Sequence, residues 1–138
     1  MIEIFPLDVE HFGDFVPQIA QADTDMAILK NLIGNKYTFA ILKNKKPIAY
    51  MGLICIWENR YMAWSVLSEE VGPYLLWITR RIKEYLENFK CYRIETYLNP
   101  GFGNSIQWAR LLGFKYESLA QKFNIDGGNS LIYCITKD

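Results

Sequence analysis

The sequence is poor in the residues that build metal centres and disulfide frameworks. It has one histidine, His11, and three cysteines among 138 residues. Zinc sites take most of their ligands from clusters of histidine and cysteine, and with one histidine no such cluster can be assembled, so no metal site is expected. The cysteines Cys55, Cys91 and Cys134 are far apart, odd in number and set in apolar runs. This pattern predicts reduced interior thiols, and His11 is expected on a helix surface.

The chain also lacks an excess of charge and a long apolar run. Fifteen Lys and Arg balance fifteen Asp and Glu, so no overall field gathers nucleic acid, anionic lipid or acidic substrates. The longest apolar stretch, Ile48 to Trp57, is about half the length of a membrane span. Residues Met1 to Pro6 do not resemble a signal peptide. We expect a soluble cytoplasmic protein without nucleic-acid or membrane partners, either a monomer or a homodimer.

The residues that are present predict one domain covering residues 1–138. A chain of this length buries about two-thirds of its unfolded surface in one core, and the sequence shows no repeat, linker or low-complexity tract. In the first half, a strand at residues 2–5 precedes a short helix from Asp8 to about residue 15 and a second helix from about residue 23 to 33. Three antiparallel strands follow at 37–42, 47–57 and 60–67. Turns at 43–46 and 58–59 join them.

In the second half the apolar period changes from two to three or four. It predicts a long helix over 71–89, then a strand at 92–98 that runs parallel to the strand at 60–67 because a helix separates them. A shorter helix over 103–112 ends at Gly113, and strands at 114–124 and 131–136 form a hairpin. The fold class is α/β (α+β), with about seven strands and about four helices in the order β-α-α-β-β-β-α-β-α-β-β.

This order, together with the segment Asn104 to Phe114 and its Leu-Gly-Phe ending, resembles the GNAT (GCN5-related N-acetyltransferase) superfamily over nearly the whole chain. The resemblance implies an acyl-CoA dependent N-acyltransferase that uses acetyl-CoA as co-substrate and transfers the acetyl group to an amine. A narrower resemblance is to the small GNAT-like proteins of tailed bacteriophages, of the T7-like internal virion protein type. The similar features are the segment 62–71, the helix ending at Gly113 and the Asp126-Gly127 hairpin.

The phage resemblance implies an alternative function. The chain would then be catalytically silent and act through a protein partner, in virion assembly or on a host protein, and it would be located in the host cytoplasm or the virion.

The superfamily resemblance assigns the cofactor site to the end of the strand at 60–67 and the helix that follows. Backbone groups there would bind the pantetheine arm, and amides at the helix start would bind the diphosphate. The residues expected at the cofactor are Val66, Leu67, Ser68, Val71, Gly72, Tyr74, Asn99 and Asn104.

The loop at this site departs from the family pattern Q/R-x-x-G-x-G/A. Residues 68–74 read Ser-Glu-Glu-Val-Gly-Pro-Tyr, with one glycine, two carboxylates that repel a diphosphate and a proline that lacks an N–H. A purely structural interpretation explains these residues more fully, with Ser68 or Glu70 capping the helix. The lysines of the turn at 43–46 are interpreted as a solvated hairpin tip.

The reaction needs a base for the amine and an acid for the leaving thiol. The superfamily places a tyrosine acid four residues before the glycine of its Leu-Gly-Phe ending, and here that residue is Ala109. The nearest candidate acids are Tyr97 and Tyr116, and Glu95 or Glu58 is the candidate base. A glutamate in a strand is more often a solvent-facing residue of the period-two alternation.

Overall fold

The computed structural model describes residues 1–12, 15, 17 and 31–138. The expected helix from Asp8 is here a 3-10 helix, η1, over Val9–His11. The expected helix over residues 23–33 lies almost wholly outside the described residues, and its last part, residues 31–34, is a turn.

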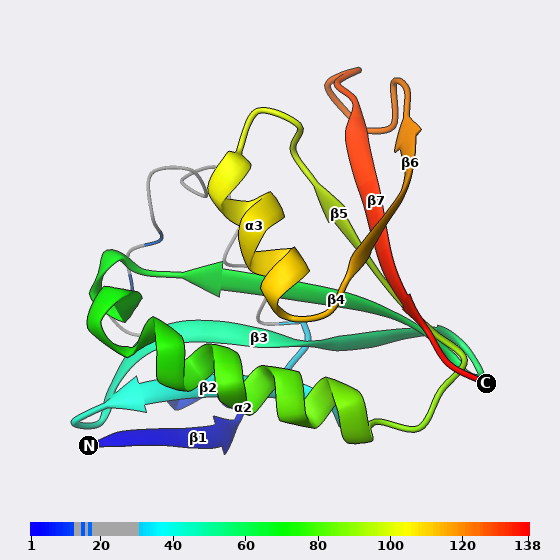
Figure 1. The fold of residues 1–138 in the computed structure, drawn as a ribbon. Helices are drawn as coiled ribbons and strands as arrows, with labels where there is room; N and C mark the ends of the chain where they lie inside the picture. Colours follow the sequence, from blue (N-terminus) through cyan, green and yellow to red (C-terminus); the bar gives the residue numbers. More distant parts are fainter. Residues whose placement is uncertain (13–14, 16, 18–30) are drawn as a thin grey trace. The chain divides into compact units, whose positions relative to one another are not determined.

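The strands are hydrogen-bonded in the order β1-β2-β3-β4-β5-β7-β6 (Figure 1). Strand β4 (Arg60–Leu67) pairs with β5 (Arg93–Leu98) in parallel. The pairs β1 with β2, β2 with β3, β5 with β7 and β6 with β7 are antiparallel. The expected fold class is therefore confirmed, including the parallel strand after the long helix.

The chain forms two compact units. Unit 1 comprises Met1–Ile54 and Ala63–Tyr74, and unit 2 comprises Cys55–Met62 and Leu75–Asp138. No helix among the described residues has the length and apolar character needed to cross a membrane.

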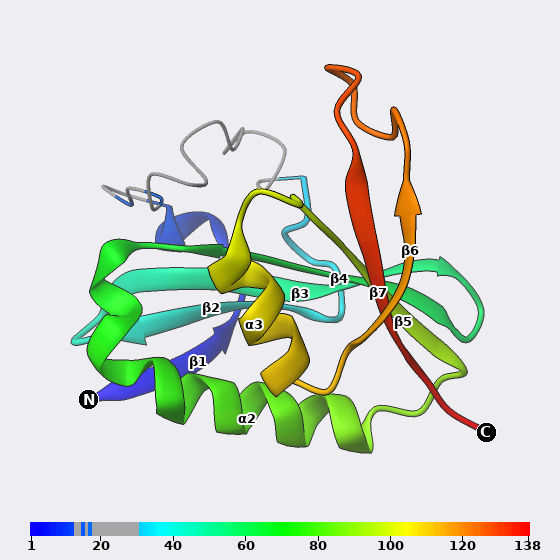
Figure 2. The same ribbon diagram turned by 45° about the horizontal axis from the view of Figure 1, so that its top comes forward.

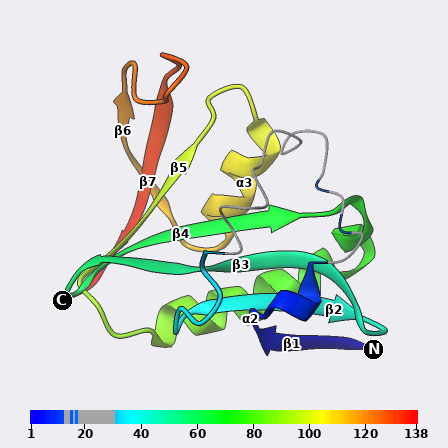
Figure 3. The same ribbon diagram turned by 180° about the vertical axis from the view of Figure 1, so that it is seen from behind.

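Unit 1 is built on β1 (Ile2–Pro6), β2 (Thr38–Lys43) and most of β3 (Lys46–Trp57), which lie side by side in Figure 3. Its core contains Leu7, Phe12, Ala40, Leu42, Tyr50 and Val66.

The expectation that His11 lies on a helix surface is wrong. The side chain is buried, its Nδ1 accepts a hydrogen bond from the Asp8 amide at 3.0 Å, and its carbonyl accepts one from the Tyr50 hydroxyl.

The hairpin between β2 and β3 has the tight turn that the sequence predicts. Asn44 and Lys45 have φ angles of 50° and 68°, and two successive positive φ angles are typical of a type I′ turn. Lys43 and Lys46 are directly opposite each other across this turn.

The long helix begins later than predicted. Residues Glu69–Tyr74 form a 3-10 helix, η3, which ends unit 1, and the α-helix α2 covers Leu75–Asn88. Pro73 lies inside η3. Because proline has no N–H and disfavours α geometry in the residue before it, the α-helical pattern begins only after Pro73.

In unit 2, helix α3 covers Gly103–Leu111 and lies beside α2 (Figures 1 and 2), where Trp108 Nε1 donates a hydrogen bond to Thr79 Oγ1 at 2.8 Å. Its end explains the Leu-Gly-Phe signature. Gly113 has a φ of 104°, its amide donates to the Arg110 carbonyl, and the Phe114 amide donates to the Ala109 carbonyl, both at 3.0 Å. These two bonds and the left-handed glycine form a Schellman motif.

The final hairpin consists of β6 (Lys115–Ala120) and β7 (Ser130–Thr136), with β7 also paired to β5. Strand β6 ends four residues earlier than predicted.

The cysteine prediction holds in part. All three are free, but Cys55 is exposed whereas Cys91 is buried.

Candidate functional site

A cluster of charged side chains lies on β4, β5 and β6 in unit 2, with Glu95 at its centre. Arg60 donates to both carboxylate oxygens of Glu95, from Nε to Oε1 at 2.6 Å and from Nη2 to Oε2 at 3.0 Å. Arg93 Nε donates to Oε1 at 2.9 Å, and the Tyr97 hydroxyl donates to Oε2 at 2.5 Å. Glu95 is only 2% exposed, so the expectation that a strand glutamate faces solvent is wrong here.

The strand register explains why these side chains meet. Arg60 and Arg93 are direct partners in the parallel ladder, and two like charges side by side on neighbouring strands repel each other. Residues 93, 95 and 97 share one face of β5 because side chains alternate along a strand. Glu95 therefore lies within reach of both guanidinium groups and compensates their charge.

A second carboxylate completes the cluster. Glu117 on β6 accepts two hydrogen bonds from Arg93, at 2.7 and 2.6 Å, in a bidentate arrangement. Cys134 Sγ on β7 donates to Glu117 Oε2 at 3.3 Å. Two arginines and two glutamates balance, so the cluster carries no net charge.

These contacts set the acid–base properties of the residues expected to do chemistry. Hydrogen bonds from Arg60, and then those from Tyr97 and Arg93, lower the pKa of Glu95 to about 2. Burial, followed by the hydrogen bond to Glu95, raises the pKa of Tyr97. A carboxylate that holds a proton this weakly is a poor general base near neutral pH, which favours a structural role for Glu95.

Tyr116, the third residue expected to do chemistry, is placed differently. It lies on β6, its side chain is 55% exposed, and its ring packs edge-on against Tyr133 with centroids 5.7 Å apart. Within the described part of the chain its hydroxyl has no hydrogen-bond partner. Ala109, at the position of the family's tyrosine, is buried in α3.

The residues expected to bind the cofactor in unit 1 end β4 and form η3. Val66, Leu67, Ser68 and Val71 are buried, whereas Gly72 is exposed. The Ser68 amide donates to the Ile48 carbonyl at 3.0 Å, and Ser68 Oγ accepts from the Glu70 amide at 3.2 Å.

Ser68 is therefore the cap that the structural interpretation predicted. The Val71 amide also donates to the Ser68 carbonyl, at 3.3 Å. Two amides at the helix start, those of Glu70 and Val71, are thus already used inside the turn.

The lysine hairpin tip contacts η3, which the sequence interpretation missed. Lys46 Nζ lies 3.4 Å from Glu70 Oε1, and Lys43 Nζ lies 5.1 Å from the centroid of the Tyr74 ring. The opposite signs of residues 43–46 and 69–70 were the only sequence signal for this contact.

The remaining two expected cofactor residues lie in unit 2, around the turn between β5 and α3. Asn99 Oδ1 accepts from the Gly101 amide at 2.8 Å, which shapes the turn. Asn104 is exposed in the first turn of α3.

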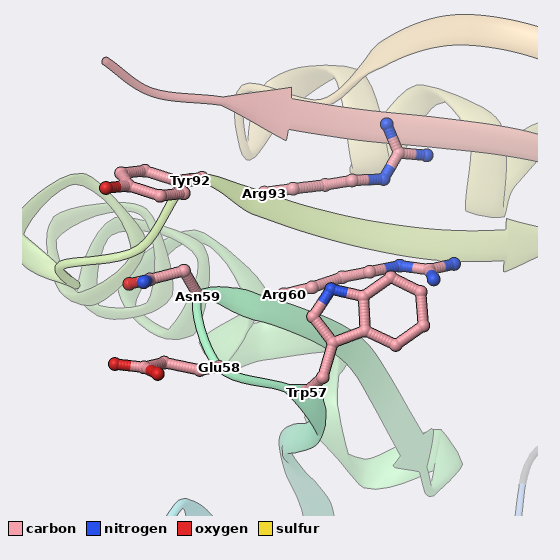
Figure 4. Close-up of a pocket in the computed structure, with 6 residues that line it drawn as sticks. All are labelled: Trp57, Glu58, Asn59, Arg60, Tyr92 and Arg93. Carbon is pink, nitrogen blue, oxygen red and sulfur yellow. The ribbon is translucent and has the colours of Figure 1, made fainter.

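An open pocket of about 440 Å³ is formed at the start of β4 and β5. The Trp57 ring lies over the Arg60 guanidinium, with a distance of 4.2 Å to the ring centroid, while Glu58, Asn59 and Tyr92 extend in another direction (Figure 4). The Tyr92 and Arg93 amides both donate to the Asn59 carbonyl. Glu58, the other candidate base, is an exposed turn residue of this pocket.

No family model and no curated protein sequence matches the chain. Solved structures do match it over nearly its whole length. Ard1 from Thermoplasma volcanium gives a TM-score of 0.79 at 9% identity, over 98% of this chain and 97% of that one. The ribosomal-protein-S18-alanine N-acetyltransferase from Escherichia coli gives 0.71 at 13% identity, over 99% and 94%.

A GNAT family acetyltransferase from Elizabethkingia anophelis with acetyl-CoA bound gives a TM-score of 0.73 at 10% identity, over 99% of this chain and 98% of that one. The chain therefore has the fold of GNAT acetyltransferases. The narrower likeness to phage proteins stays a prediction.

Proposed function

We propose that the protein is an acyl-CoA dependent N-acyltransferase that transfers an acetyl group from acetyl-CoA to an amine. The fold supports this proposal, since the structural neighbours include N-acetyltransferases and one of them has acetyl-CoA bound. Fold likeness alone is an association, so the proposal also needs a feature of this chain.

The ending of α3 is the observation that carries the proposal. Gly113 has a φ of 104°, and the Phe114 amide donates to the Ala109 carbonyl at 3.0 Å. This is the Leu-Gly-Phe ending through which the sequence resembles the GNAT superfamily. It occurs in a chain whose fold matches N-acetyltransferase structures over nearly the whole length of both chains.

The proposed cofactor contacts follow the chain through the end of β4 into η3. Backbone groups of Val66, Leu67 and Ser68 are assigned to the pantetheine arm, and Val71, Gly72 and Tyr74 to the diphosphate. Asn99 and Asn104 are assigned to the cofactor as well.

The residues around η3 fit an anionic ligand only in part. The Glu70 and Val71 amides are already used, and Glu69 and Glu70 repel phosphate. The positive charge of the neighbouring lysine tip offsets this repulsion.

In the proposed reaction the amine nitrogen attacks the thioester carbonyl, the C–S bond breaks, and CoA leaves as the thiol after gaining a proton. Tyr116 is the proposed proton donor because its phenol is exposed and makes no hydrogen bond within the described residues. Glu95 and Tyr97 are assigned to holding β4 and β5 together, because the Glu95 carboxylate accepts hydrogen bonds from Arg60, Arg93 and the Tyr97 hydroxyl.

The test is to bind acetyl-CoA to the purified protein and to follow thiol release in the presence of small amines and peptide N-termini. Acetyl-CoA at a hundredfold excess over its dissociation constant stabilises the folded state by about 2.7 kcal/mol. We expect a clear rise in melting temperature with acetyl-CoA. No rise and no thiol release would contradict the proposal and favour a silent protein that acts through a partner.

A further inference from the structure

Two lysine side chains lie next to each other at the tip of the β2–β3 hairpin. Lys43 and Lys46 are direct partners in the antiparallel ladder, and side chains of opposite residues project from the same face of a sheet. Two ammonium groups held in this way repel each other. An anion that contacts both groups would relieve the repulsion.

The same face of the tip meets η3 in unit 1. Lys46 contacts the Glu70 carboxylate at 3.4 Å, and the two side chains are 59% and 50% exposed. Lys43 lies over the Tyr74 ring, and a hydrogen bond with Tyr74 raises the pKa of Lys43. Lys43 is therefore charged at neutral pH, and both lysines lie beside the segment assigned to the diphosphate.

The turn fixes the position of the two lysines. Asn44 and Lys45 adopt the positive φ angles of a type I′ turn, which is the tightest connection between antiparallel strands. The two lysines therefore lie at the ends of adjacent strands that this turn joins.

We propose that Lys43 and Lys46 form a clamp that binds phosphate groups of the acyl-CoA. This inference rests on the proposed function. It adds the positive charge that residues 68–74, the segment assigned to the diphosphate, lack. On binding, Lys46 exchanges Glu70 for a phosphate oxygen. Lysine binds phosphate as a point charge and needs no fixed geometry, which suits two flexible side chains.

The experiment compares the Lys43→Gln, Lys46→Gln double variant with wild type by calorimetry. The matched control is Lys36→Gln with Lys115→Gln, which removes the same charge from two exposed lysines elsewhere. Each lysine at about 4 Å from a phosphate contributes roughly a fivefold gain in affinity near a solvated surface. We expect acetyl-CoA binding to weaken by about 20-fold in the clamp variant and by less than about twofold in the control.

Two further ligands identify which phosphate of CoA the clamp binds. Acetyl-pantetheine keeps the thioester and the pantetheine arm but lacks every phosphate of CoA. Its binding should therefore be equal in the clamp variant and wild type. Acetyl-3′-dephospho-CoA separates the 3′-phosphate from the diphosphate: an unchanged 20-fold loss assigns the clamp to the diphosphate, and a vanished loss assigns it to the 3′-phosphate. Glu70→Gln, which releases Lys46, should tighten acetyl-CoA binding about fivefold.

The outcomes separate the clamp from the proposed function. If wild type binds acetyl-CoA and the clamp variant binds it equally well, or if acetyl-pantetheine binding falls as much as acetyl-CoA binding, the clamp is overturned and the transferase proposal stands. If wild type binds neither ligand, both proposals are overturned. An unchanged melting temperature of the clamp variant confirms that the comparison is between folded proteins.

Discussion

The Glu95 carboxylate accepts hydrogen bonds from two nitrogens of Arg60, at 2.6 and 3.0 Å, across the parallel pair of strands. Arg93, the direct ladder partner of Arg60, contacts the same carboxylate at 2.9 Å. One buried carboxylate thus compensates two arginines that would otherwise repel each other in the ladder that joins β4 to β5.

Replacing Glu95 by Gln should destabilise the protein by about 3 kcal/mol, because removing one partner of a buried ion pair leaves uncompensated charge. The measurement is the free energy of unfolding in urea. Glu58→Gln, in the exposed turn, is the control and should change stability by less than about 0.5 kcal/mol. A loss below about 1 kcal/mol for Glu95→Gln would show that the cluster is not structural.

The same carboxylate should make stability fall in acid. Its pKa is lowered from 4.5 to about 2 in the folded protein, so its contribution is present above the unfolded pKa and is lost as the pH falls from about 5 towards 2. A shift of this size corresponds to about 3 kcal/mol. The pKa of Glu117 is also lowered, by its hydrogen bonds with Arg93, and acts in the same direction.

Unfolding free energies at pH 7, 5, 4 and 3 test this dependence. Glu95→Gln should show a flatter profile than wild type over that range. Parallel profiles for the two proteins would assign the acid sensitivity to other carboxylates.

The two tyrosines should separate structure from chemistry. Tyr97→Phe removes a hydrogen bond to the Glu95 carboxylate and should lower stability by about 1.5 kcal/mol, with kcat changed by less than about threefold. Tyr116→Phe removes the proposed proton donor and should lower kcat by about 100-fold at unchanged stability. If Tyr97→Phe abolished turnover in a folded protein, Tyr97 would be the proton donor in place of Tyr116.

Gly113→Ala should destabilise the protein by about 1 to 2 kcal/mol. Its φ of 104° is one that L side chains rarely adopt, and the glycine ends α3 in the Schellman motif. Gly103→Ala is the control at the other end of α3, where an added Cβ meets nothing within 4 Å. Thermal unfolding should show a lower melting temperature for Gly113→Ala only.

Sequence patterns predicted the order of helices and strands because local chemistry controls it. The Leu-Gly-Phe ending of α3 is a local motif, and the turn at residues 44–45 follows from which residues tolerate positive φ. The late start of α2 follows from Pro73, which has no N–H and disfavours α geometry in the residue before it. The paired lysines were visible in the sequence as a charged tip, but their contact with η3 was not.

The sequence by itself determined the strands, the parallel connection and the glycine that ends α3, since periodicity, turn residues and helix caps act over a few neighbouring positions. Only the tertiary structure decided that Glu95 is buried between Arg60 and Arg93, that His11 is interior, and that Lys46 meets Glu70. The contacts of Glu95 with Arg60, of His11 with Tyr50 and of Lys46 with Glu70 join residues 24 to 39 positions apart. Strand register and packing set them, and alternation along one strand cannot distinguish a solvent-facing glutamate from one enclosed by arginines.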